Sequence, residues 1–159
     1  MDTALRVPKS LYEQAILLDT GAVEALADSK DQYHLSAVHC RADLLELTYP
    51  LFITTLTIAE AHRRLLYKEA HRRLLYKAHL GHRQALNFLD DIYGGSVHII
   101  RPFAEDELQA REYIRRFSDQ KLTFTDTVNM AVMRRIGLLK VFSFDWHFGL
   151  LGFQVIPPF

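Results

Sequence analysis

Four acidic residues occupy positions in the sequence at which a metal-dependent reaction is expected. Asp19 follows the apolar run AILL, Glu60 lies just past LFITT, Asp145 follows VFSF, and Asp126 opens the segment DTVNMAVMRRIG. Carboxylates that converge repel one another unless a cation neutralises them. Oxygen ligands without a His or Cys cluster suit Mg2+ or Mn2+. Such an ion polarises a phosphodiester and activates water, so the four acids favour phosphodiester hydrolysis.

Each acid alone also has a purely structural interpretation. An Asp at a helix start is a common cap, which would account for Asp126. Glu60 is the fourth residue of a capping-box pattern that begins at Thr57. Asp145 could begin a turn. The functional hypothesis therefore depends on the tertiary structure bringing all four to one place.

The elements that must position these acids alternate between two kinds of segment. Short apolar runs predict strands, and the segments between them have helical spacing of their apolar residues. Strands that alternate with helices indicate an α/β domain with a mostly parallel sheet of about four or five strands, covered on both faces. Ligands bind such sheets at the carboxyl ends of the strands. The expected strands are 15–19, 51–55, 97–100, 141–145 and 153–159, and the expected helices lie in 21–48, 57–81, 82–93, 104–117 and 124–137.

Length and composition favour one domain without a global nucleic-acid-binding charge. Among the 159 residues, Lys+Arg and Asp+Glu both number 19, so the formal net charge is zero. Residues 15–159 are predicted to form a single domain, preceded by a polar N-terminal extension of residues 1–14. The single cysteine, Cys40, excludes an internal disulfide and fits a reducing compartment. The sequence has no membrane-spanning apolar run and no signal-peptide pattern, and a cytoplasmic location is the expectation.

In order and spacing, four stretches of the sequence resemble the acidic motifs of PIN-domain proteins, most closely VapC-type toxins. They are ILLDTGAVEAL, TTLTIAEA, LTFTDTVNMAVMRRIG and VFSFDWHFGLLGF. The resemblance implies a three-layer α/β/α fold. It also implies an endoribonuclease that uses Mg2+ or Mn2+, leaves a 5′-phosphate and a 3′-hydroxyl, and is held inactive by a cognate antitoxin protein.

The same resemblance assigns roles to individual residues. Asp19, Asp126 and Asp145 would be metal ligands, and Glu60 would complete the acidic pocket, either directly or through water. Hydroxyl groups beside the acids would orient the carboxylates or the water, as outer-shell partners do. Asn129, one helical turn after Asp126, could reach the pocket or lie on the helix surface. The hydroxyl-bearing residues in question are Thr20, Thr125 and Ser143.

Other chemistries find little support. The sequence contains neither the P-loop pattern nor the dinucleotide-binding glycine pattern. His62 and His71 are nine residues apart, which places them on opposite sides of a helix. His147 is expected to be a packing or loop residue rather than a catalyst.

The nonapeptide EAHRRLLYK occurs twice in tandem, at residues 60–68 and 69–77, without a difference. Nine residues turn a helix by about two and a half turns and lengthen it by about 13.5 Å. In one continuous helix, Leu65 and Leu74 would therefore point in opposite directions. An exposed leucine pair of this kind predicts a homodimer formed through the duplicated helix, because exposed apolar pairs seek partners.

The repeat leaves two questions open. Either Glu60 or Glu69 could fill the acidic pocket, and Glu60 is favoured because it stays attached to the strand before it. The basic residues of the repeat are either a solvated face or a rim that contacts RNA phosphates. They are Arg63, Arg64, Lys68, Arg72 and Arg73, followed by Lys77.

Two alternatives to an active toxin follow from the duplication. In the first, the duplicated helix disturbs the acidic site, and the chain is a catalytically impaired PIN-fold module that binds or oligomerises. In the second, a nuclease sequence was duplicated deliberately to examine how the fold tolerates it.

Overall fold

A computed structural model describes residues 14–68 and 75–158. Within these ranges a five-stranded sheet has the order β3-β2-β1-β4-β5, and every neighbouring pair of strands is parallel. The expectation of four or five mostly parallel strands is confirmed. The strands are β1 (Ile16–Leu18), β2 (Leu51–Thr54), β3 (His98–Ile100), β4 (Lys140–Phe142) and β5 (Gln154–Ile156).

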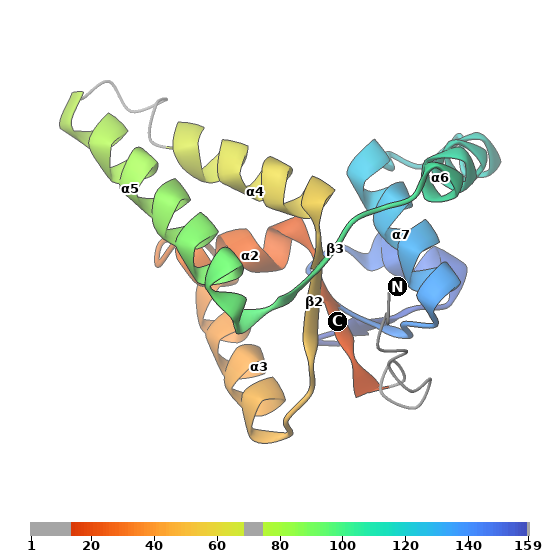
Figure 1. The fold of residues 1–159 in the computed structure, drawn as a ribbon, viewed down its shortest axis with the longest axis horizontal. Helices are drawn as coiled ribbons and strands as arrows, with labels where there is room; N and C mark the ends of the chain where they lie inside the picture. The colour runs from red at the N-terminus through yellow and green to blue at the C-terminus, as the bar shows by residue number, and fades with distance from the viewer. Residues whose placement is uncertain (1–13, 69–74, 159) are drawn as a thin grey trace, which may run out of the picture.

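Helices cover both faces of the sheet, which gives the three layers that were expected (Figure 1). One face carries α2 (Thr20–Ala27), α3 (His34–Glu46), α4 (Thr55–Tyr67) and α5 (Leu75–Asp91). The other face carries α6 (Ala104–Arg116) and α7 (Phe124–Ile136), together with the 3-10 helix η2 (Trp146–Leu151). The π-type turn η1 (Ile92–Ser96) follows α5.

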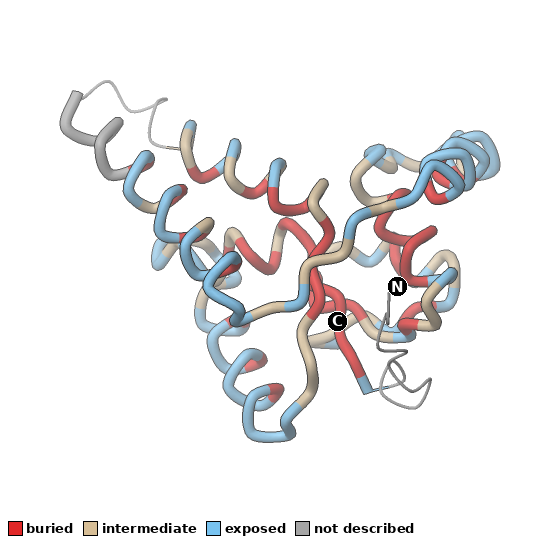
Figure 2. The backbone as a smooth tube through the Cα atoms, viewed as in Figure 1, coloured by how far each residue is buried: buried red, intermediate tan, exposed pale blue. Residues whose placement is uncertain are grey.

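The central strand β1 supplies both hydrophobic cores. Ile16 and Leu18 join the core beneath α2–α5, while Leu17 joins the core beneath α7 and η2. This alternation follows from the two-residue period of a strand. Burial on both faces explains why β1 is a continuous apolar run, and Figure 2 shows the buried positions gathered along the strands and the inner sides of the helices.

The prediction of one helix from Thr57 to Gly81 is wrong. The first helix begins at Thr55, and the Thr54 hydroxyl caps it by accepting from the Thr57 amide at 3.3 Å. The Thr57–Glu60 capping box is therefore absent, and the Glu60 carboxylate is available for other contacts. This helix, α4, ends at Tyr67, and α5 begins at Leu75 and packs against it.

Gly81 lies inside α5, where it sets how closely the two helices approach. A Cβ at this position would stand 2.7 Å from the Leu66 carbonyl oxygen and 3.3 Å from that of Leu65. The sequence pattern predicts that a helix ends at this glycine, because glycine is the residue that most often terminates helices. In the structure it permits a backbone contact between helices.

Most of the second repeat copy lies outside the described residues. Positions 69–74, which include Glu69, Arg72 and Arg73, are not described. Residues 1–13 of the predicted N-terminal extension are also outside the described ranges. Helix α4 follows β2 directly and contains Glu60 just over one turn past its start, which leaves the preference for Glu60 over Glu69 a prediction.

The structure gives the bounds of two further predicted segments. The helical spacing expected over 21–48 corresponds to two helices, α2 and α3. The strand expected over 141–145 ends at Phe142, because the chain leaves the sheet at Ser143 to form a turn, and η2 was not predicted. No helix in the described part of the chain is long and apolar enough to cross a membrane.

Gly81→Ala should lower the free energy of unfolding by about 1 to 3 kcal/mol, the usual cost of overpacking, because the new methyl group meets a backbone carbonyl. The measurement is urea unfolding followed by circular dichroism. The control is Gly94→Ala, where an added Cβ meets nothing within 4 Å. Equal stability of the two variants would contradict the close helix approach.

Candidate functional site

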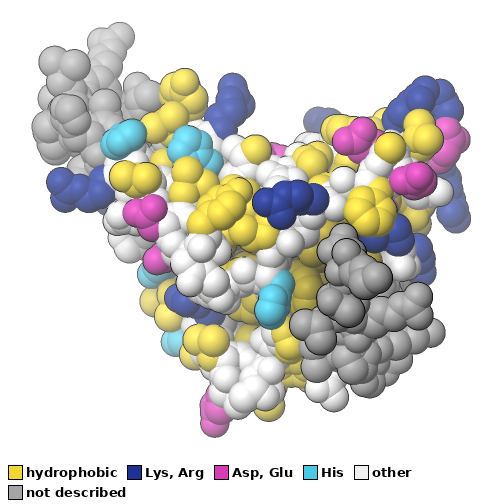
Figure 3. All heavy atoms as spheres, viewed as in Figure 1, with side chains coloured by type: hydrophobic (Ala, Val, Ile, Leu, Met, Phe, Trp, Pro, Cys, Tyr) yellow, Lys and Arg dark blue, Asp and Glu magenta, His cyan; other side chains and the backbone are white. Residues whose placement is uncertain are grey.

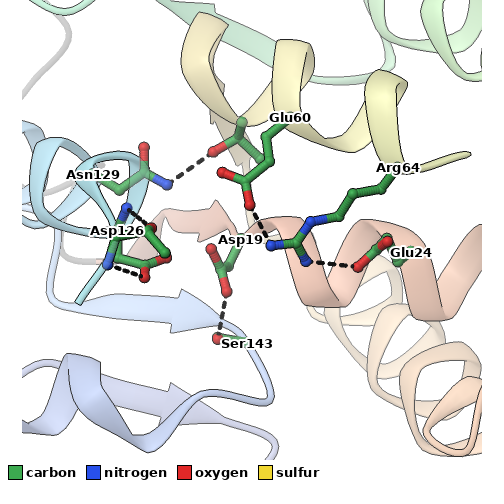
Figure 4. A network of polar contacts seen from close by, with 9 residues as sticks. Asp19, Glu24, Glu60, Arg64, Asp126, Asn129 and Ser143 are labelled. Atoms are coloured by element: carbon green, nitrogen blue, oxygen red, sulfur yellow. Dashed lines mark hydrogen bonds and ion pairs between the residues drawn. The ribbon is translucent and has the colours of Figure 1, made fainter. Parts of the chain in front are cut away.

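The candidate site lies at the carboxyl ends of β1, β2 and β4. Asp19 directly follows β1 and is the N-cap residue of α2, and Ser143 and Asp145 follow β4. β1 and β4 are neighbours on either side of the point where the strand order reverses, which is the usual ligand position in parallel sheets. Figure 4 shows Glu60 from α4 and Asp126 from α7 facing the same space as Asp19.

A single hydroxyl group connects two of the acids. Ser143 Oγ donates to Asp19 Oδ2 at 2.8 Å and accepts from the Asp145 amide at 2.9 Å. Ser143 is fully buried, and Asp19 is 4% exposed. The predicted supporting role of Ser143 thus has a geometric basis, since this residue holds the Asp19 carboxylate and the backbone of Asp145 in one arrangement.

Two oxygens at the centre of the site lack a hydrogen-bond partner among the described residues. They are Asp19 Oδ1 and Thr20 Oγ1, and both are buried. Buried polar atoms in native proteins are nearly always paired, so such an orphan requires an explanation. An oxygen-binding cation would supply the missing partner. The oxygen-only donor set of the site fits Mg2+ or Mn2+.

Electrostatics indicate that the four carboxylates lie within range of one another. Burial raises the pKa of Asp19 to about 7, and the charges of Asp126 and Asp145 act in the same direction. Burial also raises the pKa of Asp126, to which the charges of Asp145 and Glu60 add. The charged forms of Asp19 and Asp126 are therefore destabilised by burial and by the neighbouring carboxylates, as expected where a cation belongs.

Asp126 is fixed by the start of α7. Thr123 is the N-cap residue: its hydroxyl accepts from the Asp126 amide, and Asp126 Oδ2 accepts from the Thr123 amide, both at 3.1 Å. The sequence pattern predicts a helix start at Thr125 or Asp126, which is one or two residues after the observed first residue, Phe124. Thr125 is half-buried next to Asp126, and the predicted end at Gly137, with φ 81°, is confirmed.

Asn129 does not lie on the helix surface, because it is fully buried in a three-residue network between α7 and α4. Thr54 Oγ1 donates to Asn129 Oδ1 at 2.6 Å, and Asn129 Nδ2 donates to Thr57 Oγ1 at 2.8 Å. The two threonine hydroxyls are 3.2 Å apart. The network ties the start of α4, which carries Glu60, to the turn of α7 that follows Asp126 (Figure 4).

Asp145 is held by the turn that follows it. Its Oδ1 accepts from the His147 amide at 2.9 Å and also contacts His147 Nδ1. The His147 ring stacks on Trp146, with centroids 4.2 Å apart. His147 thus contacts an acid of the site.

The basic residues of the first repeat copy differ in their surroundings. Arg64 contacts Glu60 Oε1 and donates to Glu24 Oε2 at 2.9 Å. Lys68 forms ion pairs with Asp28 at 2.8 Å and Asp31 at 3.6 Å. These contacts connect α4 to α2 and the turn after it.

Arg63 is exposed, as is Arg64, but it forms no ion pair with an acid among the described residues, and its guanidinium lies 6.0 Å from the centroid of the Tyr67 ring.

As they stand, the acids do not form a closed ligand set. Among the described residues, no group of three or more His, Cys, Asp or Glu side chains is placed so that it could hold a metal ion. One carboxylate oxygen of each of three acids contacts a neighbouring donor. Asp126 accepts from the Thr123 amide, Glu60 from the Arg64 guanidinium, and Asp145 from the His147 amide.

Several residues of the site have no clear signal in the sequence. Glu24 and Thr54 meet partners 40 and 75 positions away, respectively, so local patterns do not reveal them. Thr123 could have been found, because a threonine three residues before an acid at a helix start is the capping-box pattern.

The fold and the acidic edge of the sheet are those of a PIN domain. The family model described as PIN domain matches residues 16–154, and the chain belongs to that family. A segment of 78 residues is 31% identical to the 23S rRNA-specific endonuclease VapC20 of Mycobacterium tuberculosis, in strains CDC 1551 / Oshkosh and ATCC 25618 / H37Rv. That match spans 49% of this chain and 60% of the length of these curated relatives.

Solved structures share the fold. The crystal structure of M. tuberculosis VapC20, described as a Sarcin-Ricin loop cleaving toxin, has a TM-score of 0.70 at 24% identity and covers 87% of this chain and 96% of that one. FitAcB from Neisseria gonorrhoeae has a TM-score of 0.61 at 20% identity, covering 88% and 95%. PAE2754 from Pyrobaculum aerophilum has 0.55 at 21% identity, covering 89% and 82%.

Asp19→Asn should stabilise the cation-free protein at pH 8. The pKa of Asp19 is about 7 in the folded chain and 3.8 as a free side chain, so the folded state loses stability as the pH rises from about 4 to 7. The asparagine removes this loss, which is on the order of 4 kcal/mol at most. Thermal unfolding in EDTA between pH 4 and pH 8 measures it.

The expected gain from Asp19→Asn disappears near pH 4, where the aspartate is protonated in the folded state. Asp119→Asn, at an exposed position, is the matched control and should not change the pH dependence. A destabilised Asp19→Asn variant at pH 8 would contradict the destabilising role of the buried charge.

Proposed function

We propose that this chain is a Mg2+- or Mn2+-dependent endoribonuclease, and that it acts as the toxin of a toxin–antitoxin pair. The observation that carries the proposal is the buried, unpartnered Asp19 Oδ1 at the carboxyl edge of a PIN-domain sheet, among three further acids. Similarity to a VapC20 endonuclease supports RNA as the substrate. The VapC-type resemblance of the motifs supports a cognate antitoxin as the protein partner.

In this proposal Asp19, Asp126 and Asp145 hold the ion. The bound ion would polarise the phosphodiester and favour ionisation of the attacking water. Ser143 keeps the Asp19 carboxylate turned toward the site through its 2.8 Å hydrogen bond. Glu60 stands opposite, where its carboxylate can accept the proton of the attacking water. Water would attack phosphorus and the bond to the 3′-oxygen would break; the leaving oxygen would take up a proton from solvent, which gives a 5′-phosphate and a 3′-hydroxyl.

RNA must approach a chain with no net charge, so local basic groups have to offset the repulsion of its phosphates. Figure 3 shows Lys and Arg side chains near the end of α4 and over α6, on either side of a hollow in this face. Arg63 is exposed on α4, and Arg111, Arg115 and Arg116 are exposed on α6. We assign Arg63 to the rim that contacts RNA phosphates, whereas Arg64 and Lys68 bind acids of the chain.

The alternative of an impaired binding module finds less support. It required the duplication to displace the first repeat copy, yet Leu65 of that copy is fully buried in the core and Glu60 stands beside Arg64 and the acids. A homodimer through the duplicated helix and a cytoplasmic location stay predictions.

Asp126→Asn should reduce the rate of RNA cleavage by at least about 100-fold, because a metal ligand contributes several kcal/mol of transition-state stabilisation. The asparagine oxygen can still accept the hydrogen bond from the Thr123 amide, so α7 should keep its cap. The measurement is cleavage of mixed RNA by the purified, antitoxin-free chain in Mg2+, Mn2+ or EDTA. Cleavage that persists in EDTA would contradict the proposal, as would equal activity of Asp126→Asn.

Deletion of residues 69–77 should leave cleavage within about twofold of the full chain. Leu66 and Gly81 lie close together, and the deletion leaves five residues between them, namely 67, 68 and 78–80. Two to five residues suffice to connect antiparallel helices. Glu60, Arg64 and Leu65 belong to the first copy, and none of their contacts described above involves residues 69–77. If only the shortened chain cuts RNA, the duplication silences a competent enzyme.

A further inference from the structure

The side of the site that carries Glu60 already contains a positive charge. Arg64, one turn along α4, contacts Glu60 Oε1 through Nη2 and donates through Nη1 to Glu24 Oε2 at 2.9 Å. Figure 4 shows its guanidinium between the two glutamates, beside Asp19. An arginine side chain stays charged at every pH at which the protein is folded.

Two helices hold this guanidinium in place. Glu60 lies on α4 with Arg64, whereas Glu24 lies on α2, five residues beyond Asp19. The side chains of Glu24 and Glu60 are 16% and 23% exposed, so both acceptors are largely shielded from water. A planar guanidinium that bridges two carboxylates is geometrically well defined, in contrast to the mobile point charge of a lysine.

The opposite side of the site lacks such a group. Asp19 Oδ1 and Thr20 Oγ1 have no hydrogen-bond partner among the described residues, and the carboxylates of Asp126 and Asp145 accept from the backbone amides of Thr123 and His147. A cation can therefore enter beside Asp19 without displacing a charged side chain. A cation on Glu60 would have to replace Arg64 at Oε1 and remain close to its charge.

We infer that the site holds one divalent cation, bound by Asp19, Asp126 and Asp145, and that the Arg64 guanidinium, anchored by Glu24, occupies the place of a second cation at Glu60. The inference rests on the proposed function. It makes Arg64 a positioning residue rather than an RNA contact. It also leaves Glu60 free to act on the attacking water instead of ligating a second ion.

The repeat itself offers a matched pair of variants. Arg64→Met removes the charge between Glu60 and Glu24, and Arg63→Met removes the neighbouring, exposed charge that contacts neither. We expect one equivalent of Mn2+ to bind to the wild-type chain and to Arg63→Met, and two equivalents to Arg64→Met. Isothermal titration with Mn2+ counts the ions, and electron paramagnetic resonance of free Mn2+ checks the count.

Glu24→Gln tests the same point without altering α4, in case Arg64→Met does not fold. Loss of the anchor should allow a second, weaker equivalent of Mn2+ to bind. Two equivalents on the wild-type chain would overturn the inference and leave the nuclease proposal standing. One equivalent on every folded variant would also overturn it. A wild-type chain that binds no Mn2+ and cuts no RNA would overturn both.

Discussion

Repulsion between the carboxylates that surround the buried Asp19 is the constraint on which the rest of the site depends. Asp19 directly follows the central strand and is almost completely buried. Burial raises its pKa, and the charges of Asp126 and Asp145 raise it further. In a medium of low polarity such charges are costly unless each is bound by a donor or a cation. Ser143, Thr123, His147 and Arg64 each bind a different acid, so the surrounding structure is an arrangement of donors around concentrated negative charge.

The scaffold limits how far this repulsion can move the acids apart. Asp19 follows a strand that is buried on both faces, and Asp126 is locked into a capping box. The hydrogen bonds of Asn129 to Thr54 and Thr57 join α7 to α4 without using a charge. Fully satisfied buried networks of this kind hold elements in one relative position. The network and the capping box thereby define the positions from which Glu60 and Asp126 project into the site.

The tandem duplication is compatible with this scaffold because it falls at the far end of a helical hairpin. The first copy makes the contacts that matter: Ala61 and Leu65 are buried in the core, and Arg64 and Lys68 bind acids of the neighbouring segment. Gly81 then sets the approach of α5 to α4 beyond the second copy.

Much of this architecture follows from the sequence alone. Apolar runs and helical spacing are local properties, so they determined the strands, the alternating order of elements and the positions of the four acids relative to the strand ends. Only the tertiary structure decided the partners of these residues. Arg64 meets Glu24 across 40 positions and Thr54 meets Asn129 across 75, and both contacts depend on how the helices cross. The sequence pattern predicts a helix end at Gly81, because the contact that requires a glycine there is with the Leu66 carbonyl on another helix.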